Sequence, residues 1–215
     1  MNLDLITYGN PTQDQIKDLE RETFCDVLFE QLIQYKYPKN SSEATIEELN
    51  AIVDALKTLD GKDAYVKRYK AYDFSLKRSF IEFILKDVEE KDEIIKLIEE
   101  IQEDVNPLLM KLKYYFQRPR PYQLAEYYKL KLFPYKSNSA YSPSFPSGHS
   151  YQARIITEVI GNLYPQTYAL MQKIFMDICY SRLYMGLHYQ SDIDVGIFCA
   201  DKVLALKEFK SKYKL

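Results

Sequence analysis

The chain has 215 residues, of which 47% are hydrophobic and 28% charged, and its formal net charge is −2. A chain of this length can bury a full hydrophobic core, so a single domain over residues 1–215 is expected. The nearly balanced charge excludes the strongly basic surface that general nucleic-acid binding requires. Glycine is scarce, with six residues, and the abundant leucine, isoleucine, lysine and glutamate favour helices over a turn-rich β-protein.

The N-terminal residues include neither a basic segment nor a long apolar run, so they do not resemble a signal peptide. No stretch of about 18 uncharged apolar residues is present, because Asp201 and Lys202 interrupt the best candidate, Val195–Leu206. Three widely spaced cysteines suggest reduced thiols rather than disulfides. The sequence therefore predicts a cytoplasmic protein that does not span a membrane.

Helices are expected along most of the N-terminal part of the chain. Thr12 and Gln15 have the spacing of a capping box, and apolar residues at helical spacing follow them as far as Leu32. A second helix is expected over Ala44–Leu56. Residues 62–88 contain aromatic and aliphatic side chains that predict one or two more helices.

A strongly amphipathic helix is expected from Ile94 to Leu112, where apolar residues recur with a period near 3.6. Pro107 lies within this pattern and predicts a kink, or a break followed by a new start. Lys111 and Lys113 belong to the same helix, so a regular element fixes the position of both ammonium groups.

The chain is expected to leave this helix at Arg118 and Arg120, because each precedes a proline and such residues avoid the α region. The segment from Pro121 to Pro146 has aromatic residues, prolines and serines but no sustained period. A connection of this length in a compact domain usually has a function, so we expect it to form a rim or lid over a site.

Three further helices are expected in the C-terminal part. The first has His149 near its start, the second opens at Pro165, and the last runs from about His188 to Leu206. The remaining tail, Lys207–Leu215, is basic, and we expect it to fray.

The sequence shows no β-strand pattern, internal repeat or low-complexity tract. The expected fold is therefore all-α, a single-domain helical bundle. Residues 1–90 would form variable N-terminal helices, and residues 91–207 would form the catalytic core of helices and a connecting loop.

The two histidines of the chain lie among small and polar residues rather than on an apolar face. On a helix, His188 and Asp192 would lie one turn apart, so that the carboxylate accepts one ring N–H and raises the basicity of the other nitrogen. A nucleophilic histidine needs this support. The sequence thus predicts His188 as a nucleophile oriented by Asp192.

A second group of residues fits an anion. The free N–H groups at a helix start favour negative charge, Gly148 lets a substrate approach the backbone, and the hydroxyl of Ser147 adds a donor. His149 is placed to act as a general acid. Fixed positive charge for a phosphate would come from three side chains, those of Lys113, Arg120 and Arg182. Two histidines far apart in the sequence are a poor zinc signature, so no metal is expected.

Each pattern is common by itself in proteins that have no such site. A pair of the form His-x3-Asp is usually a surface or satisfied pair, and Ser-Gly-His usually only starts a helix. A basic helix end simply complements the helix dipole. The combination of these patterns in one short region is what indicates a phosphate site.

The three blocks resemble the signature of the type 2 phosphatidic acid phosphatase and vanadium haloperoxidase superfamily, which reads Lys-x6-Arg-Pro, Pro-Ser-Gly-His and Ser-Arg-x5-His-x3-Asp. Every specified position is filled here, by Lys113, Arg120, Pro121, Pro146, Ser147, Gly148, His149, Ser181, Arg182, His188 and Asp192. The first block looks closest to the soluble class A acid phosphatases. Lys111 with Arg118 also fits that block, but Lys113 with Arg120 is preferred because the Arg-x-Arg-Pro pattern then aligns.

The resemblance implies a helical bundle of the acid phosphatase and haloperoxidase type with metal-independent phosphomonoesterase activity. It further implies that His188 forms a phosphohistidine, that Asp192 orients it, and that His149 protonates the leaving group and later helps to activate water. The residues implied in holding the phosphate oxygens are Lys113, Arg120, Ser147, Gly148 and Arg182.

Three alternatives remain open at this point. The protein could act on a lipid headgroup or an isoprenoid diphosphate as a phosphatase or phosphotransferase. It could be a haloperoxidase that takes vanadate as its cofactor, or a phosphate-binding module without turnover. For the phosphatase itself we expect no cofactor, inhibition by vanadate, a small phosphate ester as partner, and no nucleic acid. A homo-oligomer is left open.

Overall fold

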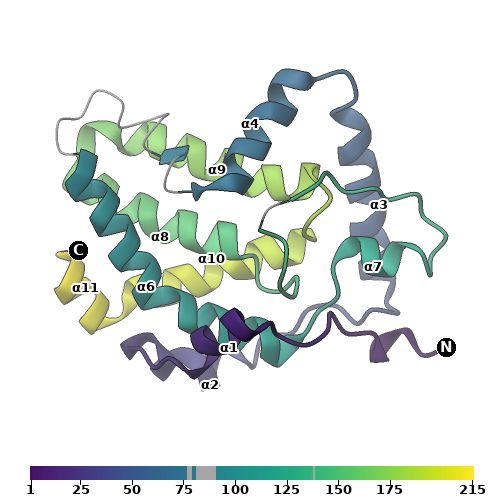
Figure 1. The fold of residues 1–215 in the computed structure, drawn as a ribbon, viewed down its shortest axis with the longest axis horizontal. Helices are drawn as coiled ribbons and strands as arrows, with labels where there is room; N and C mark the ends of the chain where they lie inside the picture. The colour runs from purple at the N-terminus through teal and green to yellow at the C-terminus, as the bar shows by residue number, and fades with distance from the viewer. Residues whose placement is uncertain (77–78, 81–90, 138) are drawn as a thin grey trace.

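The computed structural model describes residues 1–76, 79–80, 91–137 and 139–215 (Figure 1). Within these residues the regular secondary structure is helical and no strand is assigned, so the predicted all-α class is confirmed. The α-helices are α1 (Gln13–Glu20), α2 (Phe29–Leu32), α3 (Glu43–Thr58), α4 (Asp63–Phe74), α6 (Lys91–Phe116), α7 (Pro121–Ala125), α8 (Gly148–Leu163), α9 (Tyr168–Tyr184), α10 (Gln190–Ala205) and α11 (Lys207–Tyr213). Short 3-10 helices are η1 (Leu3–Leu5), η2 (Phe24–Leu28) and η3 (Pro165–Thr167).

Helix α8 is the centre of the core. It lies between α9 and α10, and α6 crosses against it (Figure 1). Its inward side chains, including Ile155, Ile156 and Val159, are completely buried. Each such aliphatic side chain stabilises the fold by about 1.5–3 kcal/mol when it is removed from water. Helices α3 and α4 pack against α9, at the end of the molecule where α10 begins (Figure 1).

The N-terminal helices form partly as expected. Thr12 and Gln15 make the predicted capping box, with the N–H of Thr12 2.8 Å from the side-chain oxygen of Gln15. The apolar pattern that extends to Leu32 is not one helix, however, because α1 ends at Glu20 and two short helical segments follow. A second capping box restarts the chain at Thr23, whose N–H donates to Asp26.

Helix α6 is longer than the sequence pattern suggests and is not broken at Pro107. Proline removes one intrahelical hydrogen bond, but the neighbouring Val105, Leu108 and Leu109 are buried against the core and hold the helix in place. Lys113 lies near the C-terminal end of the same helix, where it is only 3% exposed.

The C-terminal tail is helical and ordered against the core. The expected frayed tail is wrong, because α11 packs onto the core through Phe209 and Tyr213, and the Tyr213 hydroxyl bonds to Asp104 at 2.7 Å. Of the helices expected over residues 62–88, α4 is present, while most of the remainder lies outside the described residues.

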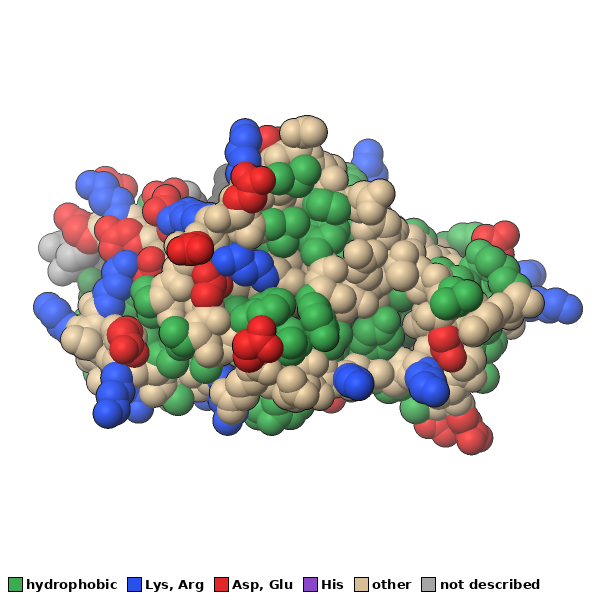
Figure 2. Space-filling view, turned by 90° about the horizontal axis from the view of Figure 1, so that it is seen from below, with side chains coloured by type: hydrophobic (Ala, Val, Ile, Leu, Met, Phe, Trp, Pro, Cys, Tyr) green, Lys and Arg blue, Asp and Glu red, His purple; other side chains and the backbone are tan. Residues whose placement is uncertain are grey.

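None of the described helices combines the length with the apolar composition that is needed to cross a bilayer. Figure 2 shows one face of the molecule, on which acidic and basic side chains are interspersed and no histidine is visible. Most residues of the predicted site are instead buried, among them Arg120, His188 and Asp192.

Candidate active site

The starts of α8 and α10 are held together through their backbones. The N–H of Ser147 donates to the carbonyl of Asp192 at 2.8 Å. Gly196 permits this approach, since a Cβ at that position would lie 2.6 Å from the carbonyl oxygen of Ser147. The second and third sequence blocks, which are far apart along the chain, therefore meet at the N-terminal ends of two neighbouring helices.

His188 lies in the short connection between α9 and α10. Gly186 makes the turn out of α9 with a φ of +73°, a conformation that favours glycine. The N–H groups of Leu187 and His188 then bond to the carbonyl of Arg182, at 3.0 and 3.3 Å. This turn fixes the His188 backbone against the end of α9.

His188 and Asp192 are in contact although they do not lie on one helix. Helix α10 begins at Gln190, so the expectation that both residues lie on one helix is wrong. Asp192 occupies the third helical position, and its carboxylate turns back to accept the N–H of Tyr189 at 3.0 Å. The same oxygen lies 3.1 Å from Nδ1 of His188, so a capping box supplies the contact that helical spacing was expected to give.

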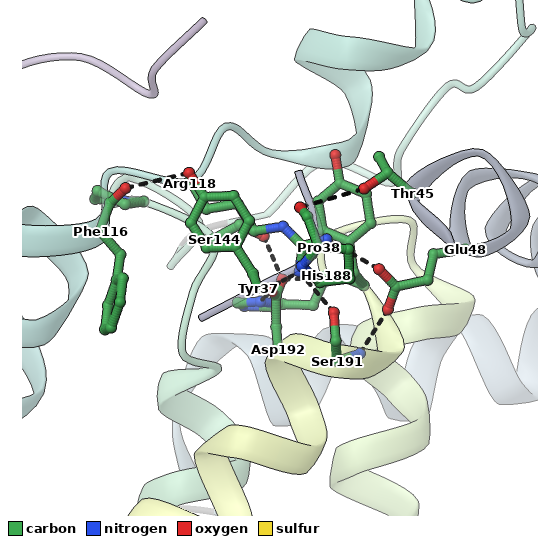
Figure 3. Close-up of polar contacts among 12 residues, drawn as sticks. Tyr37, Pro38, Thr45, Glu48, Phe116, Arg118, Ser144, His188, Ser191 and Asp192 are labelled. Carbon is green, nitrogen blue, oxygen red and sulfur yellow. Dashed lines mark hydrogen bonds and ion pairs between the residues drawn. The ribbon is translucent and has the colours of Figure 1, made fainter. Parts of the chain in front are cut away.

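The carboxylate of Asp192 is completely buried and fully hydrogen-bonded. Besides the two contacts above, Oδ2 accepts the hydroxyl of Ser144, and Oδ1 lies 2.6 Å from Nη1 of Arg118 (Figure 3). Burial pushes the pKa of Asp192 upward, but the Arg118 guanidinium and the contact with His188 outweigh it and hold that pKa below its ordinary value. Asp192 is therefore an ionised acceptor for the histidine ring.

Arg118 is fixed in turn by helix α3. Its other terminal nitrogen lies 2.9 Å from the carboxylate of Glu48, and Glu48 also accepts the N–H of Ser191 at 2.6 Å (Figure 3). The Arg118 guanidinium stacks 3.7 Å from the ring centroid of Tyr189. Glu48 and Arg118 thus connect α3 to the first turn of α10 and fix the position of the Asp192 carboxylate.

The partners of the His188 ring define its tautomer. An ionised carboxylate can only accept, so Nδ1 carries the hydrogen that is shared with Asp192. Nε2 lies 2.8 Å from Nη1 of Arg120, which can only donate, so Nε2 presents its lone pair there. Burial and the Arg120 charge lower the pKa of His188 well below its ordinary value, although Asp192 acts in the opposite direction. The ring is therefore neutral at pH 7, with an unprotonated Nε2.

Two buried cations lie beside Nε2. Arg120 donates to the carbonyls of Ser142 and Leu187, each at 2.9 Å, and Lys113 donates to the carbonyl of Pro143 at 2.8 Å. Neither makes an ion pair with a carboxylate in the part of the chain that the structure describes. Burial and the charge of Arg182 lower the pKa of Arg120 to about 10, and burial with Arg120 lowers the pKa of Lys113. The group is arranged to receive an anion.

Arg182 completes this group of cations, and it has a carboxylate partner. Its Nη1 lies 2.9 Å from Asp73 at the end of α4, and both side chains are almost fully buried. Its Nε is also buried and has no hydrogen-bond partner among the described residues. A buried donor without a partner is destabilising unless something binds it, so this nitrogen fits an oxygen of a bound phosphate.

His149 faces the same cations from the first turn of α8 and is half-buried. The backbone of Tyr72 lies within hydrogen-bonding reach of its ring. Burial and the charges of Arg182 and Arg120 lower the pKa of His149 well below its ordinary value, while Asp73 and the Tyr72 backbone act to raise it. The second histidine is therefore held between positive charge and one carboxylate.

Ser147 and Gly148 lie beside the cations but differ in the groups that they present to a bound phosphate. Ser147 is the N-cap of α8, and its fully buried hydroxyl lies 3.0 Å from the hydroxyl of Ser150, within its own helix. A Cβ on Gly148 would lie 3.2 Å from Cδ2 of Leu109 and 3.6 Å from Cε of Lys113, so this position has little room for a side chain. The backbone of Gly148 is accordingly adjacent to the Lys113 side chain.

The two alternatives for the first sequence block are placed differently. Lys113 and Arg120 lie in the cation group, whereas Arg118 binds Asp192 from the opposite side. Lys111 points away, with Nζ 2.7 Å from Asp26 and 2.8 Å from a backbone carbonyl near α1. The geometry brings together the pair that the alignment of the Arg-x-Arg-Pro pattern preferred.

Comparison with protein families supplies the identification. The sequence pattern of the PAP2 superfamily matches residues 105–200, a stretch that contains all three blocks. Residues 105–200, somewhat less than half of the chain, therefore form a PAP2 superfamily region. Together with the buried cations around His188, this match makes the protein a phosphatase. The narrower resemblance to class A acid phosphatases stays a prediction.

Comparisons with individual proteins add little to the PAP2 assignment. Among solved structures, the chain is similar to the first transmembrane PAP2-type phosphatidylglycerolphosphate phosphatase from Bacillus subtilis, with 18% identity and a TM-score of 0.38. The alignment covers 94% of this chain and 89% of that one. Values this low transfer neither substrate nor location to the present chain. No curated protein matches the sequence.

Several residues of the PAP2 site carried no signal in the sequence. Glu48 and Asp73 come from the N-terminal helices, and each is one carboxylate among many in a charged region. Ser144 lies within the irregular connection before α8. Arg118 alone had a signal, its position in the Arg-Pro repeat, but the repeat does not show that it binds Asp192.

Among the described residues, no cluster of three or more histidine, cysteine, aspartate or glutamate side chains is arranged to hold a metal ion. The positive charge that the described residues provide around His188 therefore comes from lysine and arginine side chains.

Proposed function

We propose that this PAP2 protein hydrolyses phosphate monoesters through a phosphohistidine on His188, with His149 as the general acid and without a metal ion. One observation carries the proposal: Nε2 of His188 lies 2.8 Å from Arg120 in a buried group of cations, while Nδ1 of the same ring lies 3.1 Å from the carboxylate of Asp192. A nucleophilic nitrogen beside several fixed cations suits attack on a phosphorus atom.

In the first step, Nε2 of His188 attacks phosphorus, and a P–N bond forms while the P–O bond to the leaving group breaks. The electron pair of the broken bond stays on the leaving oxygen, which takes the ring proton of His149 and departs as an alcohol. Asp192 stabilises the positive charge that develops on the His188 ring. For this attack, Arg120 has to exchange its contact with Nε2 for a phosphate oxygen.

In the second step, His149 is neutral and accepts a proton from water as the water oxygen attacks phosphorus. The P–N bond breaks, and its electron pair returns to Nε2 of His188. Inorganic phosphate leaves, and both histidines regain their starting protonation states. The same ring thus serves as acid in one step and as base in the next.

The three cations near His188 would hold the equatorial oxygens of the transferring phosphoryl group. Such a transition state needs positioning and charge stabilisation more than covalent help. Buried donors are worth more here than in water because the surroundings have a low dielectric constant. Lys113, Arg120 and Arg182 supply this charge, and none of them is more than 3% exposed.

The depressed pKa of His149 is compatible with an acid role once substrate is bound. Without an anion, burial and the neighbouring arginines disfavour the protonated ring. A phosphate ester dianion in the cation group would reverse that electrostatic balance and raise the pKa of His149. Substrate binding would therefore load the proton that the leaving group requires.

Hydrolysis of an aryl phosphate, measured with and without a chelator, tests this proposal. We expect activity that is insensitive to the chelator, is inhibited by vanadate and is lost in His188→Ala. Lack of hydrolysis between about pH 4 and 8, where histidines titrate, would contradict the proposal. Activity that survives in His188→Ala would show that the nucleophile is another residue.

A panel of substrates would show which leaving groups the enzyme prefers. It should contain sugar, nucleoside and inositol monophosphates, isoprenoid diphosphates, and phosphatidic acid in mixed micelles. We expect the monoesters to be turned over with the highest kcat/KM. A strong preference for the lipid or the diphosphate would support the alternative of a lipid or isoprenoid phosphatase instead.

A further inference from the structure

The site contains a second buried carboxylate that the sequence blocks do not include. Asp73, in the last turn of α4, is 3% exposed. Its Oδ1 lies 2.9 Å from Arg182 and also accepts the hydroxyls of Ser137 and Ser139, at 2.7 and 2.6 Å. One carboxylate therefore joins α4, α9 and the connection before α8.

His149 lies next to this junction. The backbone of Tyr72, the neighbour of Asp73, is within hydrogen-bonding reach of its ring, and both residues belong to the last turn of α4. The C-terminal end of a helix carries partial negative charge and favours a nearby cation. The groups facing His149 are thus two cations, Arg182 and Arg120, and the negative end of α4 with its carboxylate.

We infer that Asp73 is a positioning residue for leaving-group protonation: it fixes Arg182 and supports the protonated ring of His149. This inference rests on the proposed function, in which His149 gives its proton to the ester oxygen. Asp73 itself touches neither the reacting atoms nor the leaving group. It would act on His149 as Asp192 acts on His188, although through charge and backbone position rather than a direct bond.

The same carboxylate should have an opposite effect on phosphate binding. Asp73 neutralises part of the Arg182 charge and repels an anion that binds beside it. Replacing Asp73 with asparagine keeps the shape and removes this charge. Inorganic phosphate should then bind more tightly, while proton transfer to a leaving group should become worse. A general loss of packing would instead weaken both.

Leaving groups separate these effects further. The nitrophenolate anion leaves readily without a proton, whereas an alkoxide does not, so only the alkyl ester depends strongly on His149. The ratio of kcat/KM for an aryl ester to kcat/KM for an alkyl ester cancels the binding of the common phosphate group. This ratio therefore reports on proton donation.

The experiment compares Asp73→Asn with the wild type on 4-nitrophenyl phosphate and ethyl phosphate, together with the inhibition constant for inorganic phosphate. Since general acid catalysis typically contributes about 10²–10⁴-fold, we expect the aryl-to-alkyl ratio to rise by about tenfold or more. The inhibition constant for phosphate should fall. Restoring the carboxylate in Asp73→Glu should recover part of the alkyl ester activity.

A matched control lies across the same two helices. Asp177 of α9 pairs with Arg68 of α4 at 3.0 Å and accepts the hydroxyl of Tyr72 at 2.8 Å, outside the cation group. Asp177→Asn therefore removes an equivalent link between α4 and α9. It should leave both the ester ratio and the phosphate inhibition constant unchanged.

The outcomes separate this inference from the proposed function. Equal losses on both esters, or weaker phosphate inhibition in Asp73→Asn, would overturn it and assign Asp73 a structural role only. A rise in the ester ratio in Asp177→Asn as large as that in Asp73→Asn would also overturn it. If the wild type hydrolyses neither ester, the proposed function fails first. An Asp73→Asn variant that does not fold would be replaced by Asp73→Ser, which also removes the charge, and an unchanged ester ratio with unchanged phosphate inhibition in that variant would overturn the inference.

Discussion

The two histidines of the site have very different surroundings. Around His188, the supporting carboxylate of Asp192 is saturated by donors, and Arg118 holds it together with Glu48 of α3. His149 is half-buried, the Nε of Arg182 has no hydrogen-bond partner among the described residues, and serines of an irregular connection bond to Asp73.

The difference corresponds to the two roles in the proposed mechanism. A nucleophile has to present one nitrogen lone pair in a fixed direction, so its tautomer and orientation are set before substrate binds. An acid that later acts as a base has to gain and lose a proton within each turnover. We infer that the His188 side is preorganised and that the substrate dianion completes the His149 side.

The largest expected effect is the contrast between the two histidine variants. His188→Ala should lower kcat/KM for 4-nitrophenyl phosphate by about 10⁴-fold or more, as for removal of a nucleophile elsewhere. His149→Ala should be much less damaging with this ester, because nitrophenolate leaves without a proton. Steady-state kinetics on both variants checks this, and equal losses would remove the distinction between the two sides.

Asp192→Asn should lower kcat/KM by about 10³–10⁴-fold, because an asparagine amide stabilises the wrong tautomer of His188. Circular dichroism would confirm that the variant is folded. A loss below tenfold would mean that the contact of 3.1 Å between Nδ1 and the carboxylate does not orient the nucleophile.

Arg118→Met should destabilise the fold by about 3–5 kcal/mol, since it leaves Asp192 buried without its countercharge. Without Arg118 the pKa of Asp192 rises, so the lost stability is greatest near neutral pH and shrinks as the carboxyl protonates in acid. Denaturant unfolding at pH 7 and pH 4 measures this. Lys111→Met, which breaks a partly exposed pair with Asp26, is the control and should cost about 1 kcal/mol or less.

The same two lysines test which sequence block binds phosphate. Lys113→Met should lower kcat/KM by about 10²–10³-fold, the range for losing one donor to transition-state charge. Lys111→Met should retain kcat/KM within about threefold because its ammonium points to Asp26, outside the group that stabilises that charge. The reverse order would exchange the assignments of Lys111 and Lys113.

The smallest expected effect is a difference between the pH profiles of kcat/KM and kcat. In the free enzyme the pKa of His149 is lowered, so kcat/KM should fall as the pH rises through a value below 6.5, the ordinary pKa. A bound dianion raises that pKa, so the alkaline limb of kcat should lie at higher pH. If the alkaline limbs of kcat and kcat/KM coincide, the bound substrate does not raise the pKa of His149, and the proposed protonation of His149 on substrate binding is contradicted.

Much of the fold could be predicted because its helices have local signals. The capping box at Thr12, the period of α6 and the helix start at Ser147 all depend on neighbouring residues. The start of α10 was misplaced because the apolar pattern does not reveal that Tyr189 is the N-cap. The C-terminal tail was misjudged because its charged composition hides two buried aromatic side chains.

The residues of the site likewise fall into those that the sequence predicts and those that it does not. Residues fixed by the spacing of the three blocks were named from the sequence, and the structure brings His188, Asp192, Lys113, Arg120 and Arg182 together. Glu48 and Asp73 could not be predicted, because each reaches the site through the packing of α3 or α4 against distant helices. Long-range contacts of single carboxylates leave no periodic pattern in a sequence.

The most direct test of the central claim is to trap the phosphoenzyme. Wild-type protein mixed with a labelled aryl phosphate and quenched within a turnover should carry one phosphoryl group on His188, stable in base and lost in acid, and His188→Ala should carry none. Phosphate on another residue, or rapid turnover with no covalent adduct at any time point, would contradict a mechanism that passes through the nitrogen of His188.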